Sequence, residues 1–149
     1  AAVAGTFSDA IGEAIMQKYQ VHECLVENGG DIYASIVSPL HVAVFAGHSP
    51  LSEQLALHIQ PGTMGISTSS GTVGHSQSYG NADAVSVVSC SAALSDAWAT
   101  SIANAVCNPS DVQSVTNRFE NHPQIRSLMI IKDDLVGIAG KTEVVPMTT

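Results

Sequence analysis

A candidate metal-binding pair lies in residues 91–104, a segment whose pattern predicts a helix. Asp96 and Thr100 are four residues apart and therefore project from one face of that helix, with Asn104 one turn further on. A carboxylate and a hydroxyl oxygen at this spacing could supply two ligands to a hard cation such as Mg²⁺, with water or a substrate phosphate completing the shell. The alternative is an acidic residue early in a helix, stabilised by the macrodipole, with Thr100 hydrogen-bonded back to a carbonyl. The spacing alone favours this second interpretation.

A second candidate site is a turn that contains Gly29, Gly30 and Asp31 and follows an expected buried strand at 24–26. Two glycines permit positive φ or close approach of a ligand to the backbone, and Asp31 could accept a hydrogen bond from a ribose or a ring N–H. An ordinary turn between two strands, which Asn-Gly commonly forms, explains the same residues. The sequence weighs these two interpretations evenly.

The third candidate is a run of small residues at 67–74 that includes Thr68, Ser69, Ser70 and Gly71. Successive backbone N–H groups in such a run can cradle an anion. The run is not a P-loop, because the Gly-Lys-Ser/Thr ending is missing. As a motif on its own, a flexible surface loop is the more common explanation.

The sequence assigns no catalytic residue. Its six histidines show no zinc signature, and only His75 lies in the Gly/Ser/Thr-rich segment at 61–80. There is no Gly-x-Ser-x-Gly elbow, and Cys24, Cys90 and Cys107 lack basic neighbours that would activate a thiolate. Their odd number and irregular spacing are typical of reduced thiols, so we expect a cytoplasmic protein.

The charge distribution argues against two classes of binding partner, nucleic acids and membrane surfaces. The 149 residues carry 5 basic and 13 acidic side chains, a net charge of −8, which argues against a nucleic-acid partner and against a basic membrane-surface helix. Residues 32–52 are uncharged but contain prolines, histidines and serines, so we expect no membrane helix. No Lys or Arg lies between Lys18 and Arg118, so acidic residues in that interval must find partners in distant cations, backbone N–H groups or a metal. Asp31, Asp83 and Asp96 lie in candidate motifs, so each of them needs such a partner.

Hydrophobic patterning predicts one α+β domain over 1–149, without a repeat or linker. The first expected helix starts at Thr6 or Ser8, runs to about Tyr19 and presents Phe7 and Ile11 on its apolar face. The run at 61–80 has side chains too small for a core. The other expected elements are strands at 24–26, 54–59, 64–68 and 84–88, a hairpin of 32–37 and 40–45, helices at 92–106 with Ser91 as its cap and from 110 or 111 to 121, and a strand pair of 125–131 and 135–138.

Six stretches, taken together, resemble a known family. They are residues 4–5, 27–32 (ENGGDI), 44–50, 65–74 (GISTSSGTVG), 82–84 and 94–100 (LSDAWAT), and they run in family order across nearly the whole chain. The family is that of the flavin transferases called ApbE. The sequence is more closely similar to an uncharacterised ApbE-like group named UPF0280, for which the match is specific.

The resemblance implies an ApbE-like fold, an α+β domain with a mixed or antiparallel sheet and packed helices. The transferases use Mg²⁺ to split FAD and attach FMN to a Thr of a target protein. Their metal is held by an Asp and a Thr in a motif similar to Asp96 and Thr100, and by a backbone carbonyl that would fall within residues 5–7. By the same resemblance, residues 29–31 and 68–71 would line the pocket for a flavin nucleotide, FAD or FMN.

Three departures bear on activity. Ala4 stands where the transferases carry Lys, and no Asp-Pro follows His75 as it follows the transferase His. Family chains extend upstream, by a segment that we expect this chain to lack. Two hypotheses follow. The first is a Mg²⁺-dependent enzyme that handles a flavin or a related nucleotide; the second is a non-catalytic ligand-binding or assembly domain that keeps the fold, including a homo-oligomer.

Overall fold

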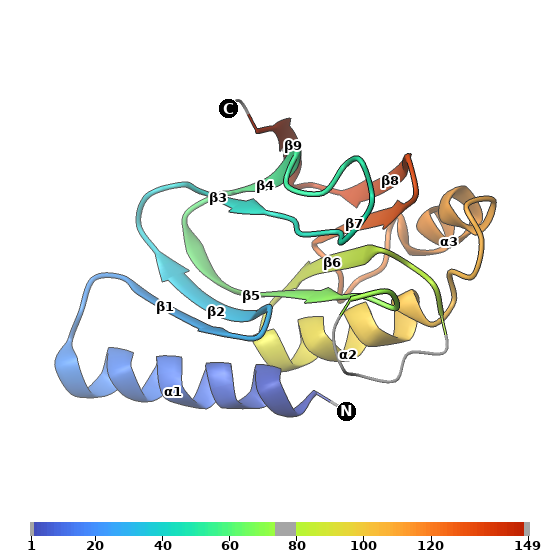
Figure 1. Ribbon diagram of the computed structural model, residues 1–149. Helices are drawn as coiled ribbons and strands as arrows, with labels where there is room; N and C mark the ends of the chain where they lie inside the picture. Colours follow the sequence, from blue (N-terminus) through green and yellow to red (C-terminus); the bar gives the residue numbers. More distant parts are fainter. Residues whose placement is uncertain (1, 74–79, 148–149) are drawn as a thin grey trace.

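A computed structural model describes residues 2–73 and 80–147 and shows an α+β fold (Figure 1). Within these residues the helices are α1 (Val3–Tyr19), α2 (Ala92–Ala103) and α3 (Asp111–Phe119), and the strands are β1 (Cys24–Asn28), β2 (Asp31–Ile36), β3 (Leu40–Ala43), β4 (Leu55–Ile59), β5 (Gly62–Ser69), β6 (Ala84–Ser89), β7 (Ser127–Lys132), β8 (Leu135–Gly140) and β9 (Glu143–Pro146). A six-stranded sheet has the order β1-β2-β5-β6-β7-β8, and a three-stranded sheet has the order β3-β4-β9. The strand pairs of the described chain are all antiparallel.

The six-stranded sheet separates two hydrophobic cores. On one face, α1, α2 and α3 cover the sheet; on the other, the three-stranded sheet packs against it (Figure 1). Alternate residues of the central strands therefore enter different cores, because successive side chains of a strand point to opposite faces. In β6, Val85 and Val87 belong to the helix-side core, whereas Ala84 and Val88 belong to the core between the sheets.

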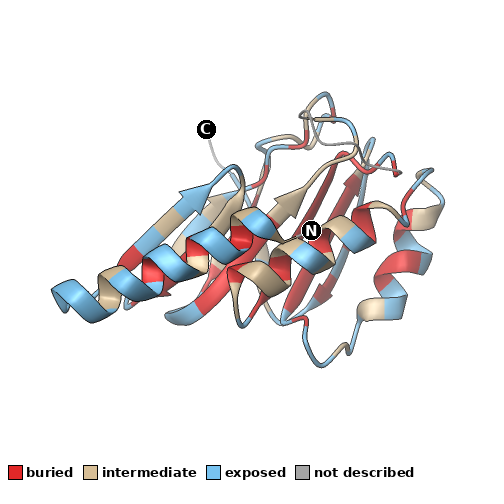
Figure 2. Cartoon of the chain, turned by 90° about the horizontal axis from the view of Figure 1, so that it is seen from below, coloured by how far each residue is buried: buried red, intermediate tan, exposed pale blue. Residues whose placement is uncertain are grey.

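Helix α1 buries its small residues rather than its large ones. Its buried residues are Gly5, Ser8 and Gly12, whereas Phe7 and Ile11 are 59% and 47% exposed (Figure 2). A Cβ at Gly5 would overlap the backbone of α2, and one at Gly12 would overlap the Tyr33 ring. The expected apolar face is therefore wrong, because the α2 backbone at Gly5 and the Tyr33 ring at Gly12 leave no room for a larger side chain. The helix also begins at Val3, earlier than predicted.

The predicted hairpin of 32–37 with 40–45 is also wrong. Strand β2 pairs with β1 and β5, while β3 pairs with β4 in the other sheet. Both edges of β2 are occupied, so no edge remains for β3. At the crossing between sheets, the N–H groups of Val37 and Ser38 donate to Glu23 Oε1 at 2.7 and 3.0 Å instead of to a strand.

Two further corrections concern β5 and β1. The segment judged too small for a core contains β5, a central strand with Met64, Gly65, Ile66 and Ser67 buried. Small side chains are needed there because Gly65 lies against the backbone that leads into α2. Strand β1 is an edge strand of which only Cys24 is buried.

Other elements agree with the sequence. Strand β6, the β7–β8 hairpin across residues 132–134 and the Ser91 cap of α2 are confirmed; the Ser91 hydroxyl accepts from Leu94 N at 3.2 Å. Strand β9 was not predicted. Among the described helices none has the length and apolar character to cross a membrane. All three cysteines are free thiols.

Candidate functional site

The glycine turn connects β1 to β2 and fixes the position of Asp31. Gly29 and Gly30 have φ of +63° and +99°, and Asn28 pairs with Asp31, as in a two-residue hairpin turn. The Gly30 N–H donates to Glu27 Oε1 at 2.7 Å. A Cβ at Gly29 would meet no atom within 4 Å, so the outer side of the turn is open. The predicted turn between two strands is therefore confirmed. Its backbone at Gly29 is also open to the approach of another molecule.

Asp31 lies on the helix-facing side of the sheet in a setting that disfavours its charge. The Ser67 hydroxyl on β5 donates to Asp31 Oδ1. Burial, with smaller contributions from the nearby carboxylates of Asp96 and Glu27, raises the pKa of Asp31 to about 6 against the lowering effect of the Ser67 hydrogen bond. Asp31 and Asp96, 65 positions apart in the sequence, therefore share one electrostatic environment.

Helix α1 joins the two acidic residues. The Gly5 N–H donates to Asp96 Oδ2 at 3.2 Å, and the Ser8 hydroxyl donates to the Asp31 carbonyl at 2.8 Å. Gly5 thus directs its N–H, rather than its carbonyl, toward Asp96. The first turns of α1 hold the β1–β2 turn and α2 in a fixed relation.

Asp96 and Thr100 provide a carboxylate and a hydroxyl one helical turn apart on α2. Asp96 and Thr100 are both half-buried on α2, and within the described chain the Thr100 hydroxyl has no hydrogen-bond partner. In the same part of the chain, neither Asp31 nor Asp96 forms an ion pair. Carboxylate and hydroxyl oxygens are the donors that Mg²⁺ prefers, and two approaching carboxylates without a counterion are stabilised by a cation. The residues present fit a hard divalent ion.

The structure separates the predicted loop residues. Ser69 lies on the same face of the six-stranded sheet as Asp31 and Ser67, whereas the Thr68 hydroxyl bonds to Ser86 Oγ at 2.8 Å on the opposite face. Beyond the strand, Ser70 Oγ accepts from the N–H groups of residues 72 and 73, and Gly71 N donates to the Ala82 carbonyl at 2.8 Å. His75 lies outside the described residues. Of the residues predicted to line a pocket at 68–71, Ser69 is the one that the strand register places on the face of Asp31, next to Ser67.

Asp9 is a residue of the site region that the sequence reasoning missed. Its two carboxylate oxygens accept from the N–H groups of Ala92 and Ala93, at 2.8 and 2.9 Å, and so cap the start of α2 from another helix. A sequence signal existed, because Gly5, Ser8 and Gly12 recur at helical spacing and mark a face that packs closely. Asp9 adjoins that face and positions the helix that carries Asp96.

A separate polar cluster surrounds Asp83. Its carboxylate accepts from Thr72 Oγ1 at 2.9 Å and from Asp133 N at 2.7 Å, and it lies 3.6 Å from Lys132 Nζ. The buried Asp83 is therefore paired with Lys132, a basic residue outside the interval without Lys or Arg, as the charge distribution predicted. A cavity of about 250 Å³ next to Asp83 is also lined by Ser49, from the segment 44–50. Two stretches that carry the family resemblance therefore meet here.

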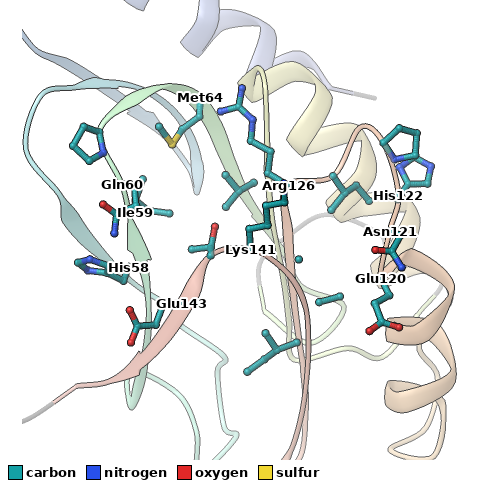
Figure 3. Close-up of a pocket in the computed structure, with 18 residues that line it drawn as sticks. His58, Ile59, Gln60, Met64, Glu120, Asn121, His122, Arg126, Lys141 and Glu143 are labelled. Carbon is teal, nitrogen blue, oxygen red and sulfur yellow. The ribbon is translucent and has the colours of Figure 1, made fainter.

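A larger cleft lies away from these residues. It has a volume of about 930 Å³ and lies between the β4–β5 connection, the segment before β7 and the β8–β9 connection (Figure 3). Met64, Arg126 and Lys141 line it, and His58 and Glu143 lie at its rim. None of the predicted site residues contributes to its lining.

Comparison with known proteins gives the family. A family model described as "AbpE bacteria" matches residues 1–125 of the chain. The chain belongs to this family. It is also similar to proteins named UPF0280 from methanogenic archaea, which agrees with the group indicated by the sequence motifs.

The relatives are longer than this family member. The UPF0280 protein of Methanococcus vannielii is 39% identical over 147 residues, which cover 95% of this chain and 59% of that protein. Those of Methanothermobacter thermautotrophicus and Methanospirillum hungatei are 38% and 44% identical, over 99% and 82% of this chain and 59% and 50% of theirs. The chain spans about three fifths or less of the length of these relatives.

Proposed function

We propose that this family member handles a flavin or a related nucleotide, FAD or FMN, in a Mg²⁺-dependent manner at the site around Asp96 and Asp31. The observation that carries the proposal is that these two acidic residues, from α2 and β2, are near enough for Asp96 to raise the pKa of Asp31, with Thr100 one turn along α2 and without a Lys or Arg ion-pair partner among the described residues. Such a site is stabilised by a divalent cation, and a bound cation attracts phosphate groups.

The chain's own residues have distinct roles in this proposal. Asp96 and Thr100 hold the ion, which when bound neutralises phosphate charge during transfer or hydrolysis. Asp31, with its pKa near 6, is ionised at neutral pH and adds negative charge to the site. The open side of the Gly29 turn lets a nucleotide approach the backbone closely, and Ser69 offers a hydroxyl on the same face.

Thermal unfolding with Mg²⁺ and FAD, separately and together, tests this proposal. A ligand that binds only the folded state stabilises it by about 2.7 kcal/mol at one hundred times its dissociation constant. We expect the wild type to be stabilised most when both are present, and Asp96→Asn to lose that gain. Asp134→Asn, which removes an exposed carboxylate elsewhere, is the matched control. Equal gains in the wild type and Asp96→Asn contradict the proposal.

The exposed face of α1 favours a second candidate, a non-catalytic assembly domain. Val3, Phe7 and Ile11 follow one another at four-residue spacing and are 63%, 59% and 47% exposed, which leaves an apolar stripe toward solvent. Light scattering after gel filtration tests this alternative. A homo-oligomer that dissociates in Phe7→Ser, without nucleotide turnover in either protein, supports it; nucleotide turnover by this chain rejects it.

A further inference from the structure

Three side chains with metal-binding atoms lie in a row across the three-stranded sheet. The strand register places His41 of β3 opposite His58 of β4, and His58 opposite Glu143 of β9. Residues directly opposite one another on neighbouring strands point to the same face, with Cβ atoms about 5 Å apart. Leu57 and Val144, at the alternate positions, pack into the core between the sheets, so the row lies on the outer face.

The two imidazoles already direct nitrogen atoms at each other. His41 Nε2 and His58 Nδ1 are 2.7 Å apart, and the ring centroids are 4.8 Å apart with an interplanar angle of 56°. In the neutral pair, one nitrogen donates the single proton between them and the other accepts it. Two imidazole nitrogens on a tetrahedral Zn²⁺, each at about 2.05 Å, are about 3.3 Å apart. Opening the pair by about 0.6 Å therefore admits the ion between the two rings.

Glu143 completes the ligand set. Its side chain is exposed and points to the same side of the sheet as the His58 ring (Figure 3). Within residues 2–73 and 80–147, no three His, Cys, Asp or Glu side chains already stand in coordination geometry, so Glu143 must change rotamer to reach the ion. Its carboxylate has no hydrogen bond or ion pair to another described residue that would oppose this change.

We infer that His41, His58 and Glu143 form a binding site for a Zn²⁺-class transition-metal ion on the outer face of the three-stranded sheet. Two imidazoles and one carboxylate, with water as the fourth ligand, suit Zn²⁺ and Co²⁺, whereas Mg²⁺ prefers an all-oxygen shell. On binding, the shared proton moves to the remote nitrogen of its own ring, so that each imidazole stays neutral. The bound ion links β3, β4 and β9, and it stabilises the sheet that covers the second core.

Co²⁺ binding, followed by the visible absorption of tetrahedral Co²⁺, and Zn²⁺ titration calorimetry test the inference. Excess Mg²⁺ in all samples occupies any oxygen site around Asp96. Loss of one outer-shell partner costs a metal site about 10–100-fold in affinity, so loss of a ligand in His41→Ala, His58→Ala or Glu143→Gln should weaken Zn²⁺ binding at least about tenfold. The wild-type melting temperature should rise with Zn²⁺, and that rise should disappear in the His58 variant.

The controls separate this site from other sources of binding. His22→Ala removes an exposed histidine outside the sheet and should bind Zn²⁺ like the wild type. Asp96→Asn should keep the Co²⁺ absorption, which makes the result independent of the proposed nucleotide site. Absence of tetrahedral Co²⁺ absorption in the wild type, or Zn²⁺ affinity unchanged in any of the three ligand variants, overturns the inference.

Discussion

Replacing Asp31 with Asn should stabilise the metal-free protein at neutral pH. Because its pKa is raised from 3.8 to about 6, the folded state retains a proton that the unfolded chain has already released between these pH values. Asp31 therefore costs nothing below about pH 4, costs progressively more as the pH rises to 6, and costs its full amount above pH 6. Asn removes this cost and can still accept the Ser67 hydrogen bond.

The magnitude follows from the size of the shift and the exposure of the group. A change from 3.8 to about 6 corresponds to about 3 kcal/mol at 1.36 kcal/mol per pH unit. Since Asp31 is only half-buried, solvent screening reduces this, and we expect a gain of about 1–2 kcal/mol for Asp31→Asn at pH 7.5. For a domain of this size, the melting temperature should rise by about 2–8 °C.

Calorimetry or circular dichroism at pH 7.5 and pH 4, without divalent ions, measures the effect. The gain should be present at pH 7.5 and nearly absent at pH 4, and the control Asp134→Asn, an exposed acidic residue, should show little change at either pH. Mg²⁺ should reduce the advantage of Asp31→Asn, because a bound cation removes the electrostatic cost. A gain of equal size at both pH values refutes the reasoning. A loss at pH 7.5 also refutes it and would show that the Ser67 hydrogen bond outweighs the cost of the charge.

Three further predictions concern residues that hold the site in place, each measured by urea unfolding. Asp9→Ala should lower the free energy of unfolding by about 0.5–2 kcal/mol, because two N–H groups at the start of α2 lose their acceptor. Asp9→Asn should recover part of that loss. An unchanged free energy of unfolding in Asp9→Ala would show that Ser91 alone caps the helix. Gly65→Ala should cost about 3 kcal/mol or prevent folding, because its Cβ overlaps backbone that cannot move aside; a wild-type midpoint would show that α2 can shift away. Asp83→Ala should cost about 1–3 kcal/mol, because the Asp133 N–H and the Thr72 hydroxyl lose their acceptor and Lys132 loses one of its two carboxylate partners. An unchanged midpoint would contradict the role assigned to Asp83.

Much of the local structure was predictable because it depends on neighbouring residues. Alternation of apolar and polar residues located β4, and a β-branched run located β6. The apolar segments on either side of residues 132–134 located the β7–β8 hairpin, and a serine before an apolar run located the start of α2. The Gly29–Gly30 turn was predictable for the same reason, since positive φ at two successive positions favours glycine. The failures arose where the partner of an element lies far away in the sequence. A large apolar residue normally marks the buried face of a helix, but α1 lies too close to the α2 backbone at Gly5 and to the Tyr33 ring at Gly12 for a larger side chain, so the glycines are buried and Phe7 is exposed.

The candidate site was also predictable only in part: its residue types follow from the sequence, but their arrangement does not. The sequence by itself singled out the residues of the proposed site, Asp31, Asp96 and Thr100, and showed that no basic residue lies near them in the chain. Only the tertiary structure decided that Asp31 and Asp96 meet through α1, that Thr68 and Ser69 point to opposite faces, and that His41, His58 and Glu143 share one row. The physical reason is that residue type and short-range periodicity set the chemistry and face of each element, whereas the pairing of elements depends on how closely distant backbones fit. That fit is a property of the packed surfaces, which neighbouring residues do not encode.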